Sequence, residues 1–230
     1  MTLLQMVNKL LRRLRENSVA STNSSEYSEL LVEFVNEAVS IVQDAYMWRT
    51  QDVNVEITTA DGTRDYVATG TTYPSMLRMV DGMAQVFLEE GNGQETPLIL
   101  ISEFEMERRY RQDTTKTGKP TRVSLIPSTT ADGWELRFYP TPDGVYTVNA
   151  KFWVPQEQFE GDGSDDATSI LPPNNPVYSY ALMMAANERG EEMGEPGNLL
   201  ERKFINDLGA AIEVAIKSDE AGNVYEFRRS

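Results

Sequence analysis

The chain has 230 residues, of which 40% are apolar, and it contains no cysteine and no histidine. Disulfides, thiol nucleophiles, cysteine zinc sites and Ser-His-Asp catalysis are therefore excluded within this chain. The formal net charge of −15 argues against a protein that reads DNA sequence, because it repels a phosphate backbone, but it is compatible with a surface that DNA passes without sticking. No apolar run approaches the roughly 18 residues that a membrane span requires.

The first helical pattern covers residues 2–16, whose apolar side chains recur at helical spacing. Basic residues cluster near its C-terminal end, where cations favour the helix dipole: Lys9, Arg12, Arg13 and Arg15. This cluster fits either an ordinary solvated helix end or a local basic patch for an acidic partner or for DNA.

A polar loop over residues 17–25 leads into a second predicted helix over residues 25–48. Its wide apolar stripe is typical of a helix that packs against a core. Asn23, followed three residues later by Glu26, predicts a capping box at its start.

From Gln51 the apolar period changes to two, which predicts β-strands. Residues 53–57 and 64–69 flank a turn at residues 60–62 and predict a hairpin. Further short strands are expected over residues 76–80, 84–88 and 122–126.

Two local signals lie between these short strands. Residues 90–93 contain two glycines and predict a turn. Ser102 and Glu105 predict the capped start of a short helix that ends near Arg111.

The clearest strand pattern is WELRFYP-TPDG-VYTVNAKFWVP, over residues 134–155. Apolar residues alternate on both sides of a turn that holds Pro140, Pro142 and the Asp143-Gly144 pair. The stretch predicts a second hairpin, around which the rest of the chain is arranged.

Residues 156–169 are acidic and contain two glycines, which predicts a mobile surface loop. Asp162, Asp165 and Asp166 could supply oxygen ligands to calcium. Their spacing does not match an EF-hand loop, so a solvated loop without a metal is the preferred interpretation.

Two more helices are predicted at the C-terminal end. The third begins with Asn175 as N-cap and Pro176 at the first helical position and runs to about Glu192, with small residues that allow close approach of another helix. The fourth covers residues 198–217, with these residues inward: Leu199, Phe204, Leu208, Ala211, Ile212 and Ala215.

These patterns predict an α+β fold: a four-helix bundle from the N- and C-terminal helix pairs, with an inserted antiparallel β-module. The predicted parts are the N-terminal helices (1–50), the β-module (51–160), the C-terminal helices (161–217) and a C-terminal tail (218–230).

No catalytic motif stands out. Glu103 and Glu107 share a helix face with Arg111, which is ordinary ion-pair decoration. We therefore predict no enzyme, cofactor or resident metal. Carboxylates distant in sequence could still face each other in a deep pocket of the β-module, as in a glycosidase, and this hydrolase alternative stays open.

The order and spacing of three stretches resemble the head-to-tail adaptor (connector) proteins of tailed bacteriophages, particularly those of short-tailed phages. The first is the second helix, LLVEFVNEAVSIVQDAYMW, with its Asn36-x-Ala38 pattern and terminal Trp48. The others are the strand, Pro-x-Pro turn and strand of residues 134–155, and the closing helix pair ILPPNNPVYSYALMMAANERGE and LLERKFINDLGAAIEVA.

The resemblance implies a virion structural protein of the neck, assembled in the host cytoplasm as a homo-oligomeric ring, typically a dodecamer. Such a ring lies under the portal protein, extends the DNA channel without sequence-specific binding, and carries tail or nozzle proteins. The alternative within this class is another neck or tail-completion ring protein.

The apolar tail is the candidate portal-docking segment, with these residues: Val224, Tyr225, Phe227, Arg228 and Arg229. Deletion of residues 219–230 is expected to abolish portal attachment and to leave the fold intact.

Overall fold

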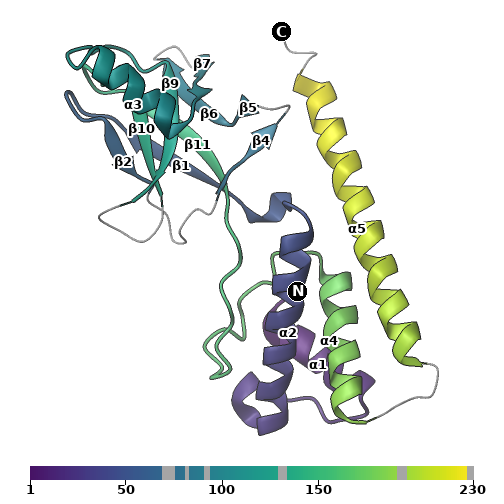
Figure 1. Cartoon of the computed structure of the whole chain (residues 1–230). Helices are drawn as coiled ribbons and strands as arrows, with labels where there is room; N and C mark the ends of the chain where they lie inside the picture. The colour runs from purple at the N-terminus through teal and green to yellow at the C-terminus, as the bar shows by residue number, and fades with distance from the viewer. Residues whose placement is uncertain (69–75, 81–82, 91–93, 129–133, 191–195, 227–230) are drawn as a thin grey trace. The chain divides into compact units, whose positions relative to one another are not determined.

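The computed structural model describes residues 1–68, 76–80, 83–90, 94–128, 134–190 and 196–226 (Figure 1). The chain divides into two compact units. The helix unit comprises Met1–Gln51 and Gln156–Ser230, and the sheet unit comprises Asp52–Pro155. The fold is α+β, as predicted, because strands occupy the middle of the chain and long helices occupy its two ends.

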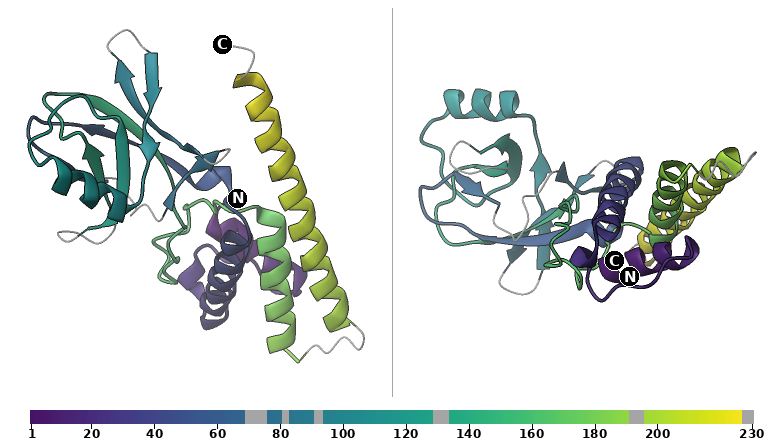
Figure 2. Two further views of the ribbon diagram at one scale, coloured as in Figure 1. Left: turned by 45° about the horizontal axis from the view of Figure 1, so that its top comes forward. Right: turned by 90° about the horizontal axis from the view of Figure 1, so that it is seen from below.

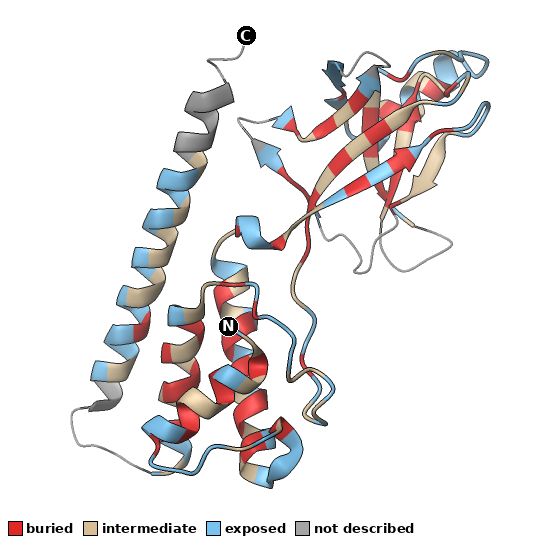
Figure 3. Ribbon diagram, turned by 180° about the vertical axis from the view of Figure 1, so that it is seen from behind, coloured by how far each residue is buried: buried red, intermediate tan, exposed pale blue. Residues whose placement is uncertain are grey.

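The helix unit contains α1 (Leu3–Arg13), α2 (Glu26–Ala45), α4 (Asn174–Glu188) and α5 (Pro196–Glu226). All four contribute apolar side chains to one core, together with Trp48, Phe159 and Ile170. In α1, α2 and α4 the buried residues follow the inward faces (Figure 3). The helix α5 lies alongside α4 (Figure 2) and is more exposed.

Small residues on α4 allow the close approach that the sequence predicts. Ala181 and Ala185 are fully buried and Ala186 nearly so. Because their side chains end at Cβ, α4 can pack between α2 and α5, which it contacts on two sides.

Both predicted helix caps in this unit are wrong. Ser25, not Asn23, caps α2 and accepts a hydrogen bond from the Ser28 amide at 3.1 Å. Asn23 lies in the 3₁₀ turn η1 (Thr22–Ser24), where its amide donates to the carbonyl oxygen of Asp162 at 2.7 Å. Three consecutive polar residues, Asn23, Ser24 and Ser25, could each cap the helix. The hydrogen bond of Asn23 to the distant Asp162 leaves Ser25 as the cap.

The start of α4 also differs, because Pro173 occupies the N-cap position instead of Asn175. Pro176 is therefore the third residue of the helix rather than the first. Amides in the whole first turn lack an intrahelical acceptor, so a proline fits at any of these positions.

The sheet unit has two main sheets. In one, the strands run in the order β1 (Asp52–Thr58), β11 (Thr147–Trp153), β6 (Val86–Glu90) and β7 (Gln94–Pro97), and β3 (Met76–Leu77) pairs with β11. In the other, the order is β2 (Asp65–Val67), β10 (Trp134–Tyr139), β9 (Arg122–Pro127) and β8 (Ile99–Leu100). A separate ribbon pairs β4 (Met79–Val80) with β5 (Met83–Ala84).

Both predicted hairpins are wrong, although their strands exist. The strands β10 and β11 lie in different sheets: β10 pairs with β9 and β2, and β11 pairs with β1 and β6. Likewise β1 and β2, expected as a hairpin, belong to different sheets. Period-two alternation shows that a strand has one buried face, but it does not specify the partner strand.

The two sheets share one apolar core, which explains why their strands separate. Phe138 on β10 and Phe152 on β11 are fully buried in this core, with Val55 of β1 and Val123 of β9. The linker between β10 and β11 bonds elsewhere: Pro142 accepts from the Gly62 amide at 2.9 Å.

Helix α3 (Glu103–Gln112) begins at Ser102, whose hydroxyl accepts from the Glu105 amide at 3.2 Å, so the predicted cap is confirmed. Met106 and Tyr110 of α3 pack with Tyr139 in a small core of their own. The predicted turn at residues 90–93 lies outside the described residues except for Glu90.

Candidate interaction surfaces

The acidic loop of residues 156–169 uses its carboxylates for internal hydrogen bonds. Asp162 accepts from the Ser164 amide at 2.8 Å, and Asp165 accepts from the Glu160 amide at 2.8 Å. Asp166 accepts from the Thr22 amide at 3.0 Å. Among the described residues, no group of three or more His, Cys, Asp and Glu side chains could hold a metal ion, so this loop gives the calcium interpretation no support.

The same hydrogen bonds change the acidity of two of these aspartates. Hydrogen bonds from Ser164 lower the pKa of Asp162. Burial on its own would raise the pKa of Asp166, but hydrogen bonds from Ser21 and Thr22 together outweigh it and lower the pKa. Both carboxylates are thus favoured in the charged form by the groups that they hold.

The backbone of this loop is joined to the rest of the helix unit. The Leu3 amide donates to the carbonyl of Thr168 at 3.0 Å, and the Ile170 amide donates to that of Met1 at 3.0 Å. Asn36 on α2 bonds to the backbone of Phe159 in both directions. These bonds anchor the loop, which its glycine- and aspartate-rich composition does not predict.

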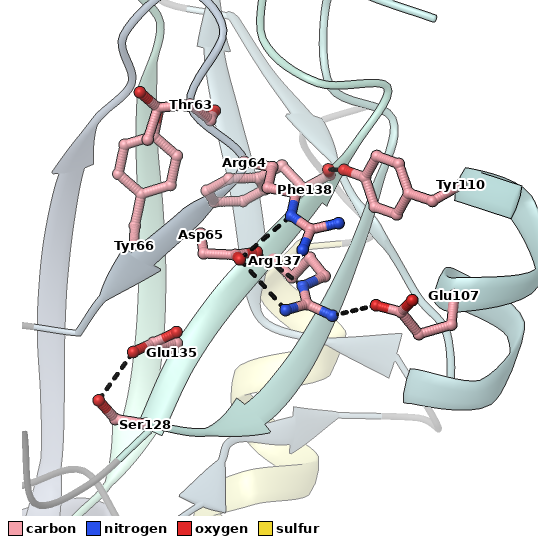
Figure 4. Close-up of polar contacts among 10 residues, drawn as sticks. All are labelled: Thr63, Arg64, Asp65, Tyr66, Glu107, Tyr110, Ser128, Glu135, Arg137 and Phe138. Carbon is pink, nitrogen blue, oxygen red and sulfur yellow. Dashed lines mark hydrogen bonds and ion pairs between the residues drawn. The ribbon is translucent and has the colours of Figure 1, made fainter. Parts of the chain in front are cut away.

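In the sheet unit, Arg137 on β10 joins two carboxylates (Figure 4). Its Nε and Nη2 donate to the two oxygens of Asp65 at 2.6 and 3.1 Å, and its Nη1 pairs with Glu107 on α3. The hydrogen bond to Asp65 is the main cause that raises the pKa of Arg137. The Tyr110 hydroxyl donates to the carbonyl of Phe138 beside this cluster, and burial raises its pKa.

This cluster bears on the hydrolase alternative. Acid catalysis on a sugar requires two carboxylates with open space between them, but the guanidinium of Arg137 lies between Asp65 and Glu107 (Figure 4). Buried Glu135 likewise accepts a hydrogen bond from the Ser128 hydroxyl at 2.8 Å. The arrangement fastens β2, β10 and α3 together, as an ion-pair cluster does.

Helix α5 presents apolar side chains outside its inward face. Phe204 is buried as predicted, but Leu199, predicted inward, is 65% exposed. Ile205 and Val214 are 56% and 68% exposed, and Ile216 is also exposed. The sequence prediction named only the inward-facing apolar residues of α5. Apolar residues that extend around more of a helix indicate that other protein surfaces cover the helix.

An apolar groove of about 680 Å³ lies on the helix unit beside α5. Its walls include Trp48, Leu171, Pro172 and Pro173 on one side, and Ala210 and Val214 of α5 on the other. At one end Asp219 pairs with Arg49 and accepts from the Tyr46 hydroxyl at 2.6 Å. A concave, mostly apolar surface of this kind suits an apolar segment of a protein partner.

The predicted docking segment is described only in part. Helix α5 continues to Glu226, so the predicted helix end at Lys217 is wrong, and Val224 and Tyr225 belong to the last turn of α5. Side chains on α5 are described as far as Asp219. Phe227, Arg228 and Arg229 lie outside the described residues.

The fold and these surfaces define a class: an α+β protein with an apolar groove and exposed apolar side chains on its helix unit. A family model described as SU10 adaptor protein matches residues 1–225. The chain therefore belongs to the SU10 adaptor protein family. This confirms the predicted resemblance to phage head-to-tail adaptors and implies a structural adaptor role in a phage.

The comparison with curated proteins found no match to this chain. No helix among the described residues is long and apolar enough to cross a membrane.

Proposed function

We propose that this chain is the subunit of an adaptor ring in the virion neck, where the ring joins the portal to the tail and extends the DNA channel. The observation that carries the proposal is the family match over residues 1–225. In this account the four helices of the helix unit form a bundle, twelve copies close the ring, and the phage is of the short-tailed type.

The charge of the chain supports the channel role. With a net charge of −15, the protein disfavours tight contact with phosphates, so DNA can pass a lumen of such subunits without being held. Contacts with the DNA would be independent of its sequence.

The exposed apolar residues of α5 support assembly with other proteins. Leu199, Ile205 and Val214 leave more than half of their surface to solvent, and a further apolar groove lies beside the helix. Surfaces of this kind are costly to leave in water and are typical of interaction sites. A ring also requires two different lateral faces, because its contacts are heterologous.

The C-terminal segment remains our candidate for portal docking: Val224, Tyr225, Phe227, Arg228 and Arg229. The deletion that tests it should begin after Asp219, because Asp219 holds Arg49 and Tyr46 within the helix unit. Deletion of residues 224–230 removes the candidate residues and keeps these contacts.

The test measures binding of the purified protein to portal particles in a pull-down. The truncated chain is expected to keep its circular dichroism spectrum and to lose portal binding. The pair Tyr225→Ala and Phe227→Ala in the full-length chain should weaken binding in the same direction, which separates side-chain contacts from helix length. Portal binding by the truncated chain at the wild-type level contradicts the docking assignment.

Another neck or tail-completion ring protein is the alternative function, and it predicts attachment to a preformed neck instead of to the portal itself. The same pull-down distinguishes the two. No contact among the described residues favours the hydrolase alternative over either of them.

A further inference from the structure

The sheet unit carries a basic surface that contrasts with the acidic chain. Residues 108–122 contain six basic residues and one acidic residue, whereas the chain as a whole has 36 acidic and 21 basic residues. We define the basic surface by Arg108, Arg109, Arg111, Lys116 and Lys119, which come from the end of α3 and the loop that follows it.

Contacts with the aromatic side chain of Tyr139 bring α3 and the loop together. The guanidinium of Arg109 lies 5.9 Å and the ammonium of Lys116 lies 5.8 Å from the centre of the Tyr139 ring. The Gly118 amide donates to the carbonyl of Thr141 at 2.9 Å, which holds the loop next to the end of β10. Arg109 of α3 and Lys116 of the loop therefore lie near the same tyrosine ring. Arg108, Arg111, Lys116 and Lys119 are exposed.

The helix unit carries a surface of opposite charge. Helix α2 contains five acidic residues and no basic residue. We define its acidic face by Glu26, Glu29, Glu33, Glu37 and Asp44, all of which are exposed. Their helical spacing places them on one side of α2, over about 27 Å at a rise of 1.5 Å per residue.

We propose that the basic surface of one copy docks against the acidic face of α2 in the next copy. This inference rests on the proposed ring and names one of its lateral contacts. The contact is heterologous, since the two surfaces differ and lie in different units of the chain. Such contacts generate closed rings when the rotation between neighbours closes.

Charge complementarity favours a second copy over DNA as the partner. In the basic surface, Arg108 and Arg109 already share the carboxylate of Glu105, at 2.7 and 2.8 Å. Asp113, directly after α3, is exposed, and Glu103 is exposed at the other end of the helix. A DNA duplex presents uniform negative charge, so these acidic residues repel it. A protein surface can instead place its carboxylates opposite the basic residues and away from the acidic ones.

Exposed ion pairs contribute little each, so this contact sets register and association rate more than affinity. Apolar surface, including that of α5, supplies the rest. A contact of this type is weak between two copies and becomes effective when the ring or a template holds several copies together.

The test compares ring assembly of full-length variants by mass photometry, with the portal added if the wild type requires it. The variant Lys116→Glu with Lys119→Glu is expected to raise the protein concentration for half assembly about tenfold or more, because like charges then face each other. Addition of Glu29→Lys and Glu33→Lys to the same chain should restore assembly.

The control is Asn17→Glu with Ser18→Glu, two exposed residues of the polar loop that precedes α2. It adds two negative charges outside both surfaces and should assemble like the wild type. Circular dichroism of each variant confirms that the fold is kept.

Wild-type assembly by the Lys116→Glu, Lys119→Glu variant overturns the inference and leaves the proposed ring standing. Failure of the lysine substitutions on α2 to restore assembly overturns the pairing of these two surfaces. If the first variant assembles normally but loses binding to double-stranded DNA, the basic surface serves nucleic acid and the inference is wrong. A wild type that forms no ring with or without portal overturns both the inference and the proposed function.

Discussion

The side-chain amide of Asn36 bonds in both directions to the backbone of Phe159. Its Nδ2 donates to the Phe159 carbonyl at 3.0 Å, and its Oδ1 accepts from the Phe159 amide at 2.8 Å. Asn8 on α1 forms the same pair with Val19, at 3.0 and 2.8 Å. In each case one asparagine of a helix supplies a donor and an acceptor to the backbone of an irregular segment. These two hydrogen bonds fix the segment to the helix surface.

The substitution Asn36→Ala should lower the free energy of unfolding by about 1–3 kcal/mol, because two backbone groups of Phe159 lose their partners near the core. Urea denaturation measures the change. The control Asn17→Ala removes an exposed amide from a polar loop and should stay within about 0.5 kcal/mol of wild type. Equal stability of the two variants would show that the pair does not anchor the loop.

Gly163 in the acidic loop has a backbone that glycine alone adopts readily. Its φ is +92°, and a Cβ at this position would lie 2.6 Å from the Ser21 hydroxyl oxygen. Gly163→Ala should therefore destabilise the protein by more than about 1 kcal/mol in thermal or urea unfolding. In contrast, Gly209→Ala on α5 meets no atom within 4 Å and should be neutral or stabilising by up to about 1 kcal/mol. A neutral result at both positions contradicts the assigned loop geometry.

Ionisation of Asp166 should contribute to the pH dependence of the free energy of unfolding. Its pKa in the folded protein is below the ordinary value of 3.8, so the folded state favours the charged carboxylate. This contribution is present above the ordinary pKa and is lost as the pH falls through the folded pKa.

We therefore expect Asp166→Asn to be less stable than wild type at neutral pH and to approach it under acidic conditions, below the ordinary pKa. Urea midpoints across that range measure the difference. A gap between the two proteins that stays constant with pH would contradict a role for the charge.

Arg137 pairs with Asp65 and Glu107, so its removal leaves Glu107 without this cation and leaves Asp65 with Arg64 alone, whose Nε lies 3.2 Å from its Oδ2. Arg137→Met should destabilise the sheet unit by about 1–3 kcal/mol; the partial exposure of the two acids keeps the cost below that of a fully buried pair. Thermal unfolding measures it.

Asp65→Asn and Glu107→Gln, added to Arg137→Met, should recover part of the loss, because they remove the repulsion that the single variant creates. No recovery would mean that the packing of the arginine stem, and not its charge, holds β2 and α3 in place.

The sequence predicts elements better than it predicts their neighbours. Apolar spacing located α1, α2, α4 and the start of α5 within a few residues, and Ser102 was correctly placed as the cap of α3. The helix α5 runs further than expected, to Glu226. Its predicted end at Lys217 followed the end of the inward stripe, but a helix can continue where its side chains face solvent or a partner.

Strand pairing was not predictable from the same pattern. Phe138 and Phe152 alternate with polar residues as in a hairpin, and the intervening Pro-x-Pro-Asp-Gly stretch favours a turn. Yet each strand pairs with other strands of its own sheet: β10 with β2 and β9, and β11 with β1, β3 and β6. The choice depends on which sheets close over a common core, and that is a property of the whole unit.

Of the candidate surfaces in the Results, the C-terminal segment was proposed from the sequence, and it stays a prediction. The groove beside α5 joins Pro172 and Pro173 to Ala210 and Val214, which are about forty residues away along the chain, so no local pattern indicates it. The cluster of Arg137, Asp65 and Glu107 likewise combines three distant segments. Such sites form only when tertiary contacts bring the segments together.

The most direct test of the proposed function is mass photometry of the purified protein, first alone and then mixed with a candidate portal. We predict either a ring or a monomer that becomes a ring only on the portal, and the mass of the ring gives the copy number. A protein that stays monomeric and does not respond to any portal would contradict the adaptor function.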